Sequence, residues 1–290
     1  MDDFPKDPKI AGLALFTHIP SEGSRMINRS YRSNFVGPFI AAIMMIAVSS
    51  CGGGGGGGAT PPPPPPANVS PGGLWIGVDS NGGDIVAIVT ETGRFHFLTL
   101  DDLSQGSGII SVSNVNNLSG DFQLVTQLGF VFADGTTLAN CTLSGTVTER
   151  QTMTVTVNCT TTAGLQSQST ATLNYDASYD RDSSLAAIAG NYQGISAVLN
   201  ITGDGTIFSQ DAATGCVVNG QVGIIDAAFN AYDFGFTYNN CLGQEAILNG
   251  STFSGIAALD NTGNPEVLIV TATGTVGAVL VSFIQALDRI

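Results

Sequence analysis

Lysine is missing from nearly the whole chain, because Lys6 and Lys9 are the only two. From Cys51 to the C-terminus the sequence has four arginines and 19 acidic residues, which give a net charge of 4 − 19 = −15. Nucleic-acid binding needs Lys and Arg side chains that displace counterions from the phosphates. Anionic lipid headgroups would also repel so acidic a surface. The charge therefore excludes nucleic acid as a partner and predicts a body that does not lie on a membrane surface.

Residue types that commonly carry out catalysis are also scarce. From Cys51 onward His96 is the only histidine, and neither a Cys-x-x-Cys pair nor a Gly-x-Ser-x-Gly motif occurs. These absences argue against a zinc site and against a Ser-His-Asp triad. Alternation with Phe95 and Phe97 predicts that His96 lies on the exposed face of a strand. We therefore expect a protein that is not an enzyme, with no catalytic residue, no metal and no cofactor.

A pair of carboxylates is the catalytic arrangement that the composition leaves open. Acidic residues occur in predicted loops at Asp101, Asp102, Asp180, Asp182 and Asp204. None of them has the spacing of an EF-hand, so we expect solvated turn residues. Two acidic side chains roughly 5–9.5 Å apart in one cleft would instead indicate a carboxylate-dependent hydrolase of envelope glycans. That hydrolase is kept as an alternative function.

The apolar run at residues 35–48 is too short to cross a bilayer as a helix. Its 14 residues would span roughly 21 Å of a hydrocarbon core that is ~30 Å thick. The length fits the apolar segment of a secretory signal peptide, and Arg29 and Arg32 supply its positive flank. We therefore interpret residues 1–50 as the signal peptide region. A signal peptide that starts at Met26 is complete by itself, so the residues before it are expected to be a start-site artefact.

The end of this region, Val-Ser-Ser-Cys-Gly at positions 48–52, places an aliphatic residue and two small ones before Cys51. It resembles the lipobox of bacterial lipoproteins, which signal peptidase II processes. The resemblance implies that the Cys51 thiol receives a diacylglycerol and that Cys51 becomes the first residue of a membrane-anchored protein. Gly52 in place of Asp resembles the kind sorted to the outer membrane, on its periplasmic or its surface face. An ordinary cleaved signal peptide and an uncleaved membrane helix remain as alternatives.

The segment 51–72 has the composition of a tether. Gly52–Gly58 is a run of seven glycines and Pro61–Pro66 a run of six prolines. The first is expected to be a flexible coil and the second a polyproline II spacer of roughly 19 Å. The glycines match the pattern Gly-x-Gly-x-x-Gly, but without a preceding strand and a following helix they do not indicate dinucleotide binding. The segment therefore predicts a spacer that holds the body away from the membrane.

The rest of the chain has the pattern of an all-β protein, with turn residues every ~8–12 positions. Apolar and polar side chains alternate in Thr152–Cys159, and Tyr232–Tyr238 has an aromatic side chain at every second position. We predict two related antiparallel β-barrels or β-sandwiches in tandem. They are expected over residues 73–175 and 190–290, joined by a linker with a short helix at 176–189.

Two pairs of similar segments support an internal repeat. The pattern Gly-x-aromatic-x-Gly occurs at Gly73–Gly77 and again at Gly190–Gly194. Downstream, similar residues follow Cys141 and Cys216. Aligning the halves on these cysteines predicts an insertion at 101–137 in the first half.

The four remaining cysteines form an even set, which in an exported chain predicts two disulfides. Folding a hairpin about Arg150 places Cys141 opposite Cys159 on the apolar face, and cross-strand neighbours can be bridged. In the second half, Cys241 is one residue out of register for pairing with Cys216, which a β-bulge would correct. We expect pairing within each half, and the two other connectivities stay open.

The opening Gly73-Leu74-Trp75 resembles the first motif of lipocalins, which implies a barrel with a ligand cavity. Our first functional hypothesis is nevertheless a lipid-anchored outer-membrane lipoprotein whose β-domains have a non-catalytic binding, adhesive or envelope-structural role toward an unknown protein partner. The alternative is a lipocalin-like carrier of small apolar ligands. A wide interior lined by small residues would favour the carrier, and a core filled by Tyr232–Tyr238 would count against it.

Overall fold

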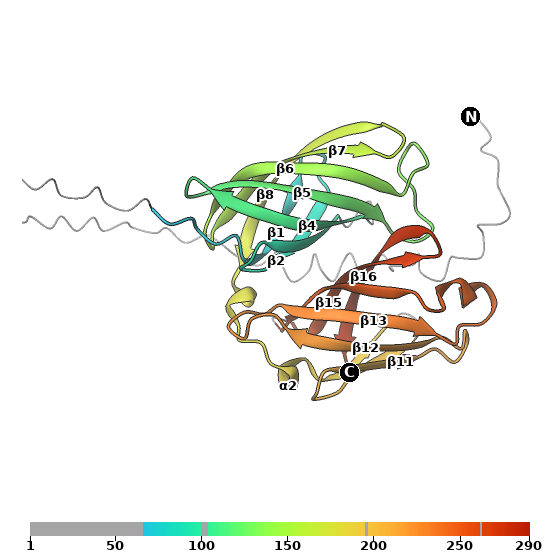
Figure 1. Ribbon diagram of the computed structural model, residues 1–290. Helices are drawn as coiled ribbons and strands as arrows, with labels where there is room; N and C mark the ends of the chain where they lie inside the picture. Colours follow the sequence, from blue (N-terminus) through green and yellow to red (C-terminus); the bar gives the residue numbers. More distant parts are fainter. Residues whose placement is uncertain (1–65, 100–103, 195–196, 262) are drawn as a thin grey trace, which may run out of the picture.

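The computed structural model describes residues 66–99, 104–194, 197–261 and 263–290. They form an all-β protein with two closed, eight-stranded antiparallel barrels in tandem (Figure 1). The predicted fold class is confirmed, and both units are barrels, not sandwiches. The predicted signal peptide, Cys51 and most of the Gly/Pro tether lie outside the described residues. Within the described part, no helix is long and apolar enough to cross a membrane.

Barrel 1 is a meander in which each strand pairs with the next and the last pairs with the first. Closure leaves the sheet without an edge, so every strand is paired on both sides. Successive side chains point alternately into the barrel and away from it. The strands are β1 (Gly73–Asp79), β2 (Asp84–Val89), β3 (Arg94–Thr99), β4 (Ser104–Ser113), β5 (Asn117–Thr126), β6 (Leu138–Thr148), β7 (Thr152–Thr161) and β8 (Gln166–Asp176).

Barrel 2 follows the same plan, and its first strand pairs with both the second and the last. A 3-10 helix, η3 (Gly243–Leu248), lies between its fifth and sixth strands. The strands are β9 (Gly190–Gln193), β10 (Val198–Ile201), β11 (Thr206–Gln210), β12 (Val217–Ile224), β13 (Tyr232–Asn239), β14 (Thr252–Asp260), β15 (Val267–Val276) and β16 (Val279–Arg289).

The connection between the barrels contains two short helical elements, η2 (Ala177–Asp180) and α2 (Leu185–Ile188). Ser184 caps α2, because its hydroxyl oxygen accepts a hydrogen bond from the backbone N–H of Ala187. Both elements pack one large side chain, Tyr179 and Ile188, into the protein interior.

The disulfide of barrel 1 joins Cys141 on β6 to Cys159 on β7. The two cysteines are direct cross-strand partners, with Cα atoms 4.1 Å apart. Arg150 lies in the turn and has a positive φ of 53°. The register is the predicted one, because a hairpin that turns symmetrically about Arg150 fixes every later pair.

The disulfide of barrel 2 joins Cys216, just before β12, to Cys241, just after β13. The last ladder pair before it is Val217 with Asn239. Asn240 then adopts a φ of 59°, a left-handed conformation that asparagine tolerates better than most residues. Asn240 is thus the one extra residue that the sequence indicates, and it brings Cys241 next to Cys216.

The barrels share a strand plan, but their disulfides occupy different places in it. The repeated Gly73–Gly77 and Gly190–Gly194 motifs both begin on the first strand of their barrel. The disulfide joins the sixth and seventh strands of barrel 1 but the fourth and fifth strands of barrel 2. The alignment of Cys141 with Cys216 is therefore wrong. Residues 101–137 are not an insertion, because they contribute β4 and β5, which the closed sheet of barrel 1 requires.

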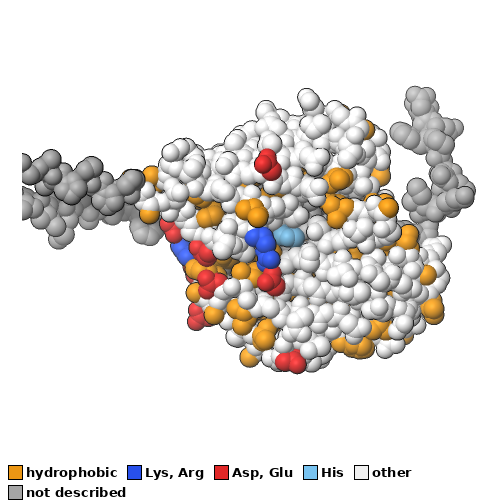
Figure 2. Space-filling view, viewed as in Figure 1, with side chains coloured by type: hydrophobic (Ala, Val, Ile, Leu, Met, Phe, Trp, Pro, Cys, Tyr) orange, Lys and Arg blue, Asp and Glu red, His pale blue; other side chains and the backbone are white. Residues whose placement is uncertain are grey.

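An apolar interface joins the two barrels. Outward-facing side chains of β1, β2 and β3 pack there against β14 and the connecting segments. In Figure 1, β1 and β2 lie on the side of barrel 1 that is toward barrel 2. An ion pair between Arg94 and Asp233 and an isolated β-bridge between Gln127 and Ser282 also cross the boundary. Figure 2 shows basic and acidic side chains in contact where the two barrels meet. Each fully buried aliphatic side chain contributes about 1.5–3 kcal/mol. The buried residues are Leu74, Val86, Ile88, Leu98, Tyr179, Ala231, Ile256 and Ala258.

Candidate functional site

Barrel 1 contains an apolar cavity of about 260 Å³. Its wall comes from all eight strands, with most of the side chains on β2, β3, β7 and β8, and alternation places the inward-facing ones on one face of each strand. Most are aliphatic, and two rings of β3, Phe95 and Phe97, add an aromatic patch. Apolar side chains in this arrangement favour an uncharged, apolar occupant over water.

A buried aromatic side chain on the first strand of each barrel marks one end of its interior. In barrel 1, Trp75 is fully buried, and its indole N–H donates to the carbonyl of Pro71 at 3.1 Å. In barrel 2, Tyr192 is equally buried, and its hydroxyl donates to the carbonyl of Ile188 at 2.7 Å. Both bonds reach back four residues. The repeated sequence motif is therefore also a repeated structural motif.

Gly73 is required where it stands, because a Cβ atom there would lie 2.5 Å from the Trp75 indole nitrogen. Tyr175 packs edge-on against the Trp75 ring, with ring centroids 5.4 Å apart. The start of β1 and the end of β8 thus close one end of barrel 1, and the cavity lies toward the other end.

The other end of the barrel 1 cavity has a polar rim. Asp79 and Asn81 lie where β1 turns into β2, and Gln168 lies on β8. The Asp79 carboxylate accepts hydrogen bonds at 2.8 Å from the backbone N–H groups of Asn81 and Gly83. No Lys or Arg lines the cavity within the described residues. The site therefore offers apolar contact and a few hydrogen bonds, but no cation for an acidic ligand.

Aromatic side chains largely fill the interior of barrel 2. The row Tyr232, Phe234, Phe236 and Tyr238 on β13 is buried, as its alternation predicts. Phe236 packs on Phe253 and Phe283 with ring centroids 5.2 and 4.9 Å apart. A smaller cavity of about 110 Å³ remains beside these rings. Barrel 1 therefore keeps an open interior, but large side chains such as Phe95, Phe97 and Met153 line it, not the small residues expected of a carrier. The filled core of barrel 2 counts against a carrier there.

The prediction that His96 is exposed is wrong. His96 does face away from the barrel 1 interior, but barrel 2 covers that face and leaves it 7% exposed. One ring nitrogen lies 2.7 Å from the side-chain nitrogen of Gln105. Burial, with a smaller effect from the Arg94 charge, lowers the pKa of His96 to about 4. His96 is therefore a residue of the interface and does not line either cavity.

The acidic residues considered for catalysis lie in separate places. Asp180 pairs with Arg150, and Asp182 is exposed. Asp204 accepts a hydrogen bond from the Thr202 hydroxyl, which lowers the pKa of Asp204. Asp101 and Asp102 lie outside the described residues. In the part of the chain that the structure describes, no three His, Cys, Asp or Glu residues are grouped to hold a metal ion.

Two other carboxylates, Asp211 and Glu245, line the cavity of barrel 2. Asp211 accepts hydrogen bonds from the backbone N–H groups of Ala213 and Thr214 at 2.8 and 3.4 Å. An apolar cavity of about 150 Å³ accommodates benzene, and the space here is smaller, about 110 Å³, so it holds no more than a single ring. It does not accommodate the two sugars that flank a glycosidic bond.

The interface between the two barrels was not predicted from the alternation of apolar and polar residues. Its signal in the sequence is a set of uninterrupted apolar runs, Ile85–Val89, Ile256–Leu259 and Leu268–Val270, in which every residue is buried. A strand that is apolar at consecutive positions is buried on both faces. One face of each of these strands lines its own barrel, and the other face is available for the second barrel.

Comparison with known proteins adds little to this description. No protein-family model and no curated protein matches the sequence. Among solved structures, one match is a Bacteroides fragilis protein provisionally described as an outer membrane protein. It is 12% identical, and the match covers 77% of this chain and 98% of that one with a TM-score of 0.22. So low a TM-score supports no conclusion about function, which we take from the residues themselves.

Proposed function

We propose that this chain is an exported bacterial lipoprotein, anchored in the outer membrane through acylated Cys51, in which barrel 1 binds a small, neutral, apolar ligand without catalysis. The observation that carries the ligand-binding part is the apolar cavity of about 260 Å³ inside barrel 1, and the anchor is supported by the resemblance of residues 48–52 to a lipobox. The lipid and the Gly/Pro spacer would hold this binding body at a distance from the membrane.

The lining of the cavity determines the class of ligand. A carboxylate would meet Asp79 at the rim and no Lys or Arg along the described wall, so desolvating its charge would be uncompensated. The volume is close to twice that of a cavity that accommodates benzene, which suggests roughly ten non-hydrogen atoms. A micromolar dissociation constant would need about 0.8 kcal/mol from each of roughly ten atoms, which lies within the bound for ligands of this size.

The ligand can be tested with 1-naphthalenemethanol and its anionic counterpart 1-naphthoate, using calorimetry on the full-length protein. We expect the alcohol to bind at least about tenfold more tightly, which is about 1.4 kcal/mol. Ala171→Phe fills the cavity from β8 and should weaken binding of the alcohol by about tenfold or more. Thr172→Phe is the matched control, because the next side chain on β8 faces solvent. Equal affinity for the alcohol in wild type and A171F would contradict the proposal.

The anchor can be tested by mass spectrometry and fractionation of the protein expressed in a bacterium. The mature chain should begin at Cys51 and carry acyl mass on that residue. Cys51→Ser should remove the acyl mass and move the protein from the membrane fraction to the soluble one, because the anchor is the acyl chains. Ser50→Ala keeps the cysteine and should remain in the membrane. A wild-type chain that starts elsewhere, or that carries no acyl mass, would overturn this part.

A further inference from the structure

The cavity of barrel 2 differs in chemistry from that of barrel 1. Aromatic rings of β13 and β16, namely Phe234, Phe236, Tyr238 and Phe283, form much of its lining. Its volume of about 110 Å³ is below the roughly 150 Å³ of a cavity that accommodates benzene, so at most one ring enters it and any further group of a ligand lies at the rim. Stacked and edge-on contacts with these side chains would favour an aromatic ring over an alkyl chain.

Tyr238 supplies a polar group that the fold itself does not use. Its side chain is 7% exposed and lines the cavity, and no hydrogen bond to its hydroxyl occurs within the described residues. The phenol is protonated at neutral pH and can donate, and burial raises its pKa further above its ordinary value. The hydroxyl is not one of the fully enclosed atoms that lack a partner, so it is reachable from the cavity and can donate a hydrogen bond to a ligand with an acceptor atom.

The rim of this cavity is negative. Asp211 and Glu245 line it, and the described lining contains neither Lys nor Arg. The whole chain has a net charge of −14. Within a partly desolvated site, two carboxylates attract a cation and repel an anion much more strongly than in bulk water. The rim therefore favours a positively charged ligand over a negatively charged one.

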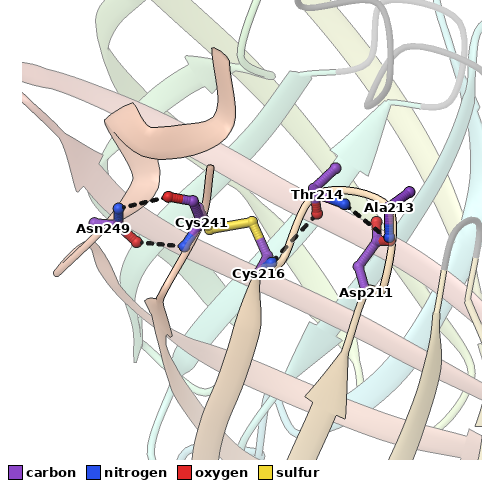
Figure 3. Close-up of a disulfide and its surroundings, with 6 residues drawn as sticks. All are labelled: Asp211, Ala213, Thr214, Cys216, Cys241 and Asn249. Carbon is purple, nitrogen blue, oxygen red and sulfur yellow. Dashed lines mark hydrogen bonds between the residues drawn. A yellow bond between two sulfur atoms is a disulfide. The ribbon is translucent and has the colours of Figure 1, made fainter. Parts of the chain in front are cut away.

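The rim is also held in place. Figure 3 shows the Cys216–Cys241 disulfide between the Asp211–Thr214 turn and Asn249. Asn249 accepts a hydrogen bond from the N–H of Cys241 at 2.7 Å and donates to its carbonyl at 2.9 Å. A rim fixed by a covalent bond and hydrogen bonds loses little freedom when a ligand binds.

We propose that barrel 2 carries a second binding site, for a small organic ammonium ion with one aromatic ring. The ring lies among Phe234, Phe236 and Phe283, a ring substituent accepts a hydrogen bond from Tyr238, and the ammonium lies at the rim near Asp211 and Glu245. This site is separate from the barrel 1 cavity and selects the opposite chemistry, a cation in place of a neutral apolar molecule.

Tyramine is a suitable probe, because it combines one ring, a ring hydroxyl and a primary ammonium. We expect full-length protein to bind tyramine at least about tenfold more tightly than 3-(4-hydroxyphenyl)propionate, measured by calorimetry, and the advantage to shrink as salt is raised. Phenethylamine, which lacks the ring hydroxyl, should bind about fivefold more weakly than tyramine. Binding of the anion as tightly as of the cation would overturn the proposal.

Two variants assign the roles of single residues. Tyr238→Phe keeps the ring and should abolish the preference for tyramine over phenethylamine. Glu245→Gln should weaken tyramine about threefold or more and leave neutral 4-ethylphenol unchanged, whereas Glu149→Gln, on the exposed β6–β7 turn of barrel 1, should change neither. Unchanged discrimination in Y238F, or equal effects of E245Q and E149Q, would contradict the assignment. Binding of 1-naphthalenemethanol to barrel 1, measured in the same samples, reports separately on the first site and on folding.

Discussion

Trp75→Ala should lower the free energy of unfolding by about 3–5 kcal/mol, the range for large aromatic side chains removed from a core. Trp75 is fully buried at one end of barrel 1, and its indole N–H bonds to Pro71. The substitution removes the packing against Tyr175 and leaves a void that the closed sheet cannot collapse to fill. Urea denaturation followed by circular dichroism would measure the loss, since the variant has no tryptophan to report by fluorescence.

Two further variants separate packing from hydrogen bonding at this position. Trp75→Phe keeps a ring and removes the donor, so its loss should be smaller than that of W75A. Tyr192→Ala makes the corresponding change in barrel 2, where the ring is equally buried, and should cost a similar amount. A loss below about 1 kcal/mol in W75A would show that the barrel repacks around this position.

Acidification from pH 7 to pH 4 should cost about 3 kcal/mol of unfolding free energy through His96 alone. Burial lowers its pKa from 6.5 to about 4 in the folded state, and each unit corresponds to about 1.36 kcal/mol. Below pH 6.5 the unfolded chain binds a proton on His96, whereas the folded chain does not until the pH is near 4. The free energy of unfolding therefore falls as the pH falls. The loss begins near pH 6.5 and is complete near pH 4, where the folded form is protonated too.

The effect is isolated by comparison with His96→Gln, which cannot titrate at this position. The difference in unfolding free energy between wild type and H96Q should change by about 3 kcal/mol between pH 7 and pH 4, because contributions from the carboxylates cancel in the difference. A constant difference over this range would mean that His96 is exposed to water in the folded protein. Because His96 lies in the interface, we also expect acid to loosen the contact between the barrels first.

Local pattern was enough to predict the strands with alternating side chains and to favour disulfide pairing within each half. The period of two in Thr152–Cys159 identifies a strand with one apolar face, and β7 runs through this segment. The equal distances of Cys141 and Cys159 from Arg150 predict a pairing that the structure contains. These predictions hold because a hairpin depends only on residues close in sequence, and its register follows from the position of the turn.

Sequence similarity between the two halves led to a wrong prediction, because it was used to infer which strands correspond. Matching Cys141 to Cys216 equates two hairpins that are two strands apart in the plan of the barrels. A cysteine pair can bridge any neighbouring strands whose Cα atoms come close enough, so its position says little about strand number. The Gly-x-aromatic motif was the better guide, because Trp75 and Tyr192 are both placed by packing at the start of a first strand.

The sequence by itself determined the all-β class, the inward face of the clearly alternating segments Thr152–Cys159 and Tyr232–Tyr238, and the pairing of Cys141 with Cys159, because these depend on alternation and on local turns. Only the tertiary structure decided that His96 is buried, that barrel 1 keeps a cavity of about 260 Å³ and that the aromatic row of barrel 2 leaves less space. Exposure depends on which surface a second unit covers, and free volume depends on side chains that eight separate strands bring to one axis. Neither quantity is a property of any short stretch of the chain.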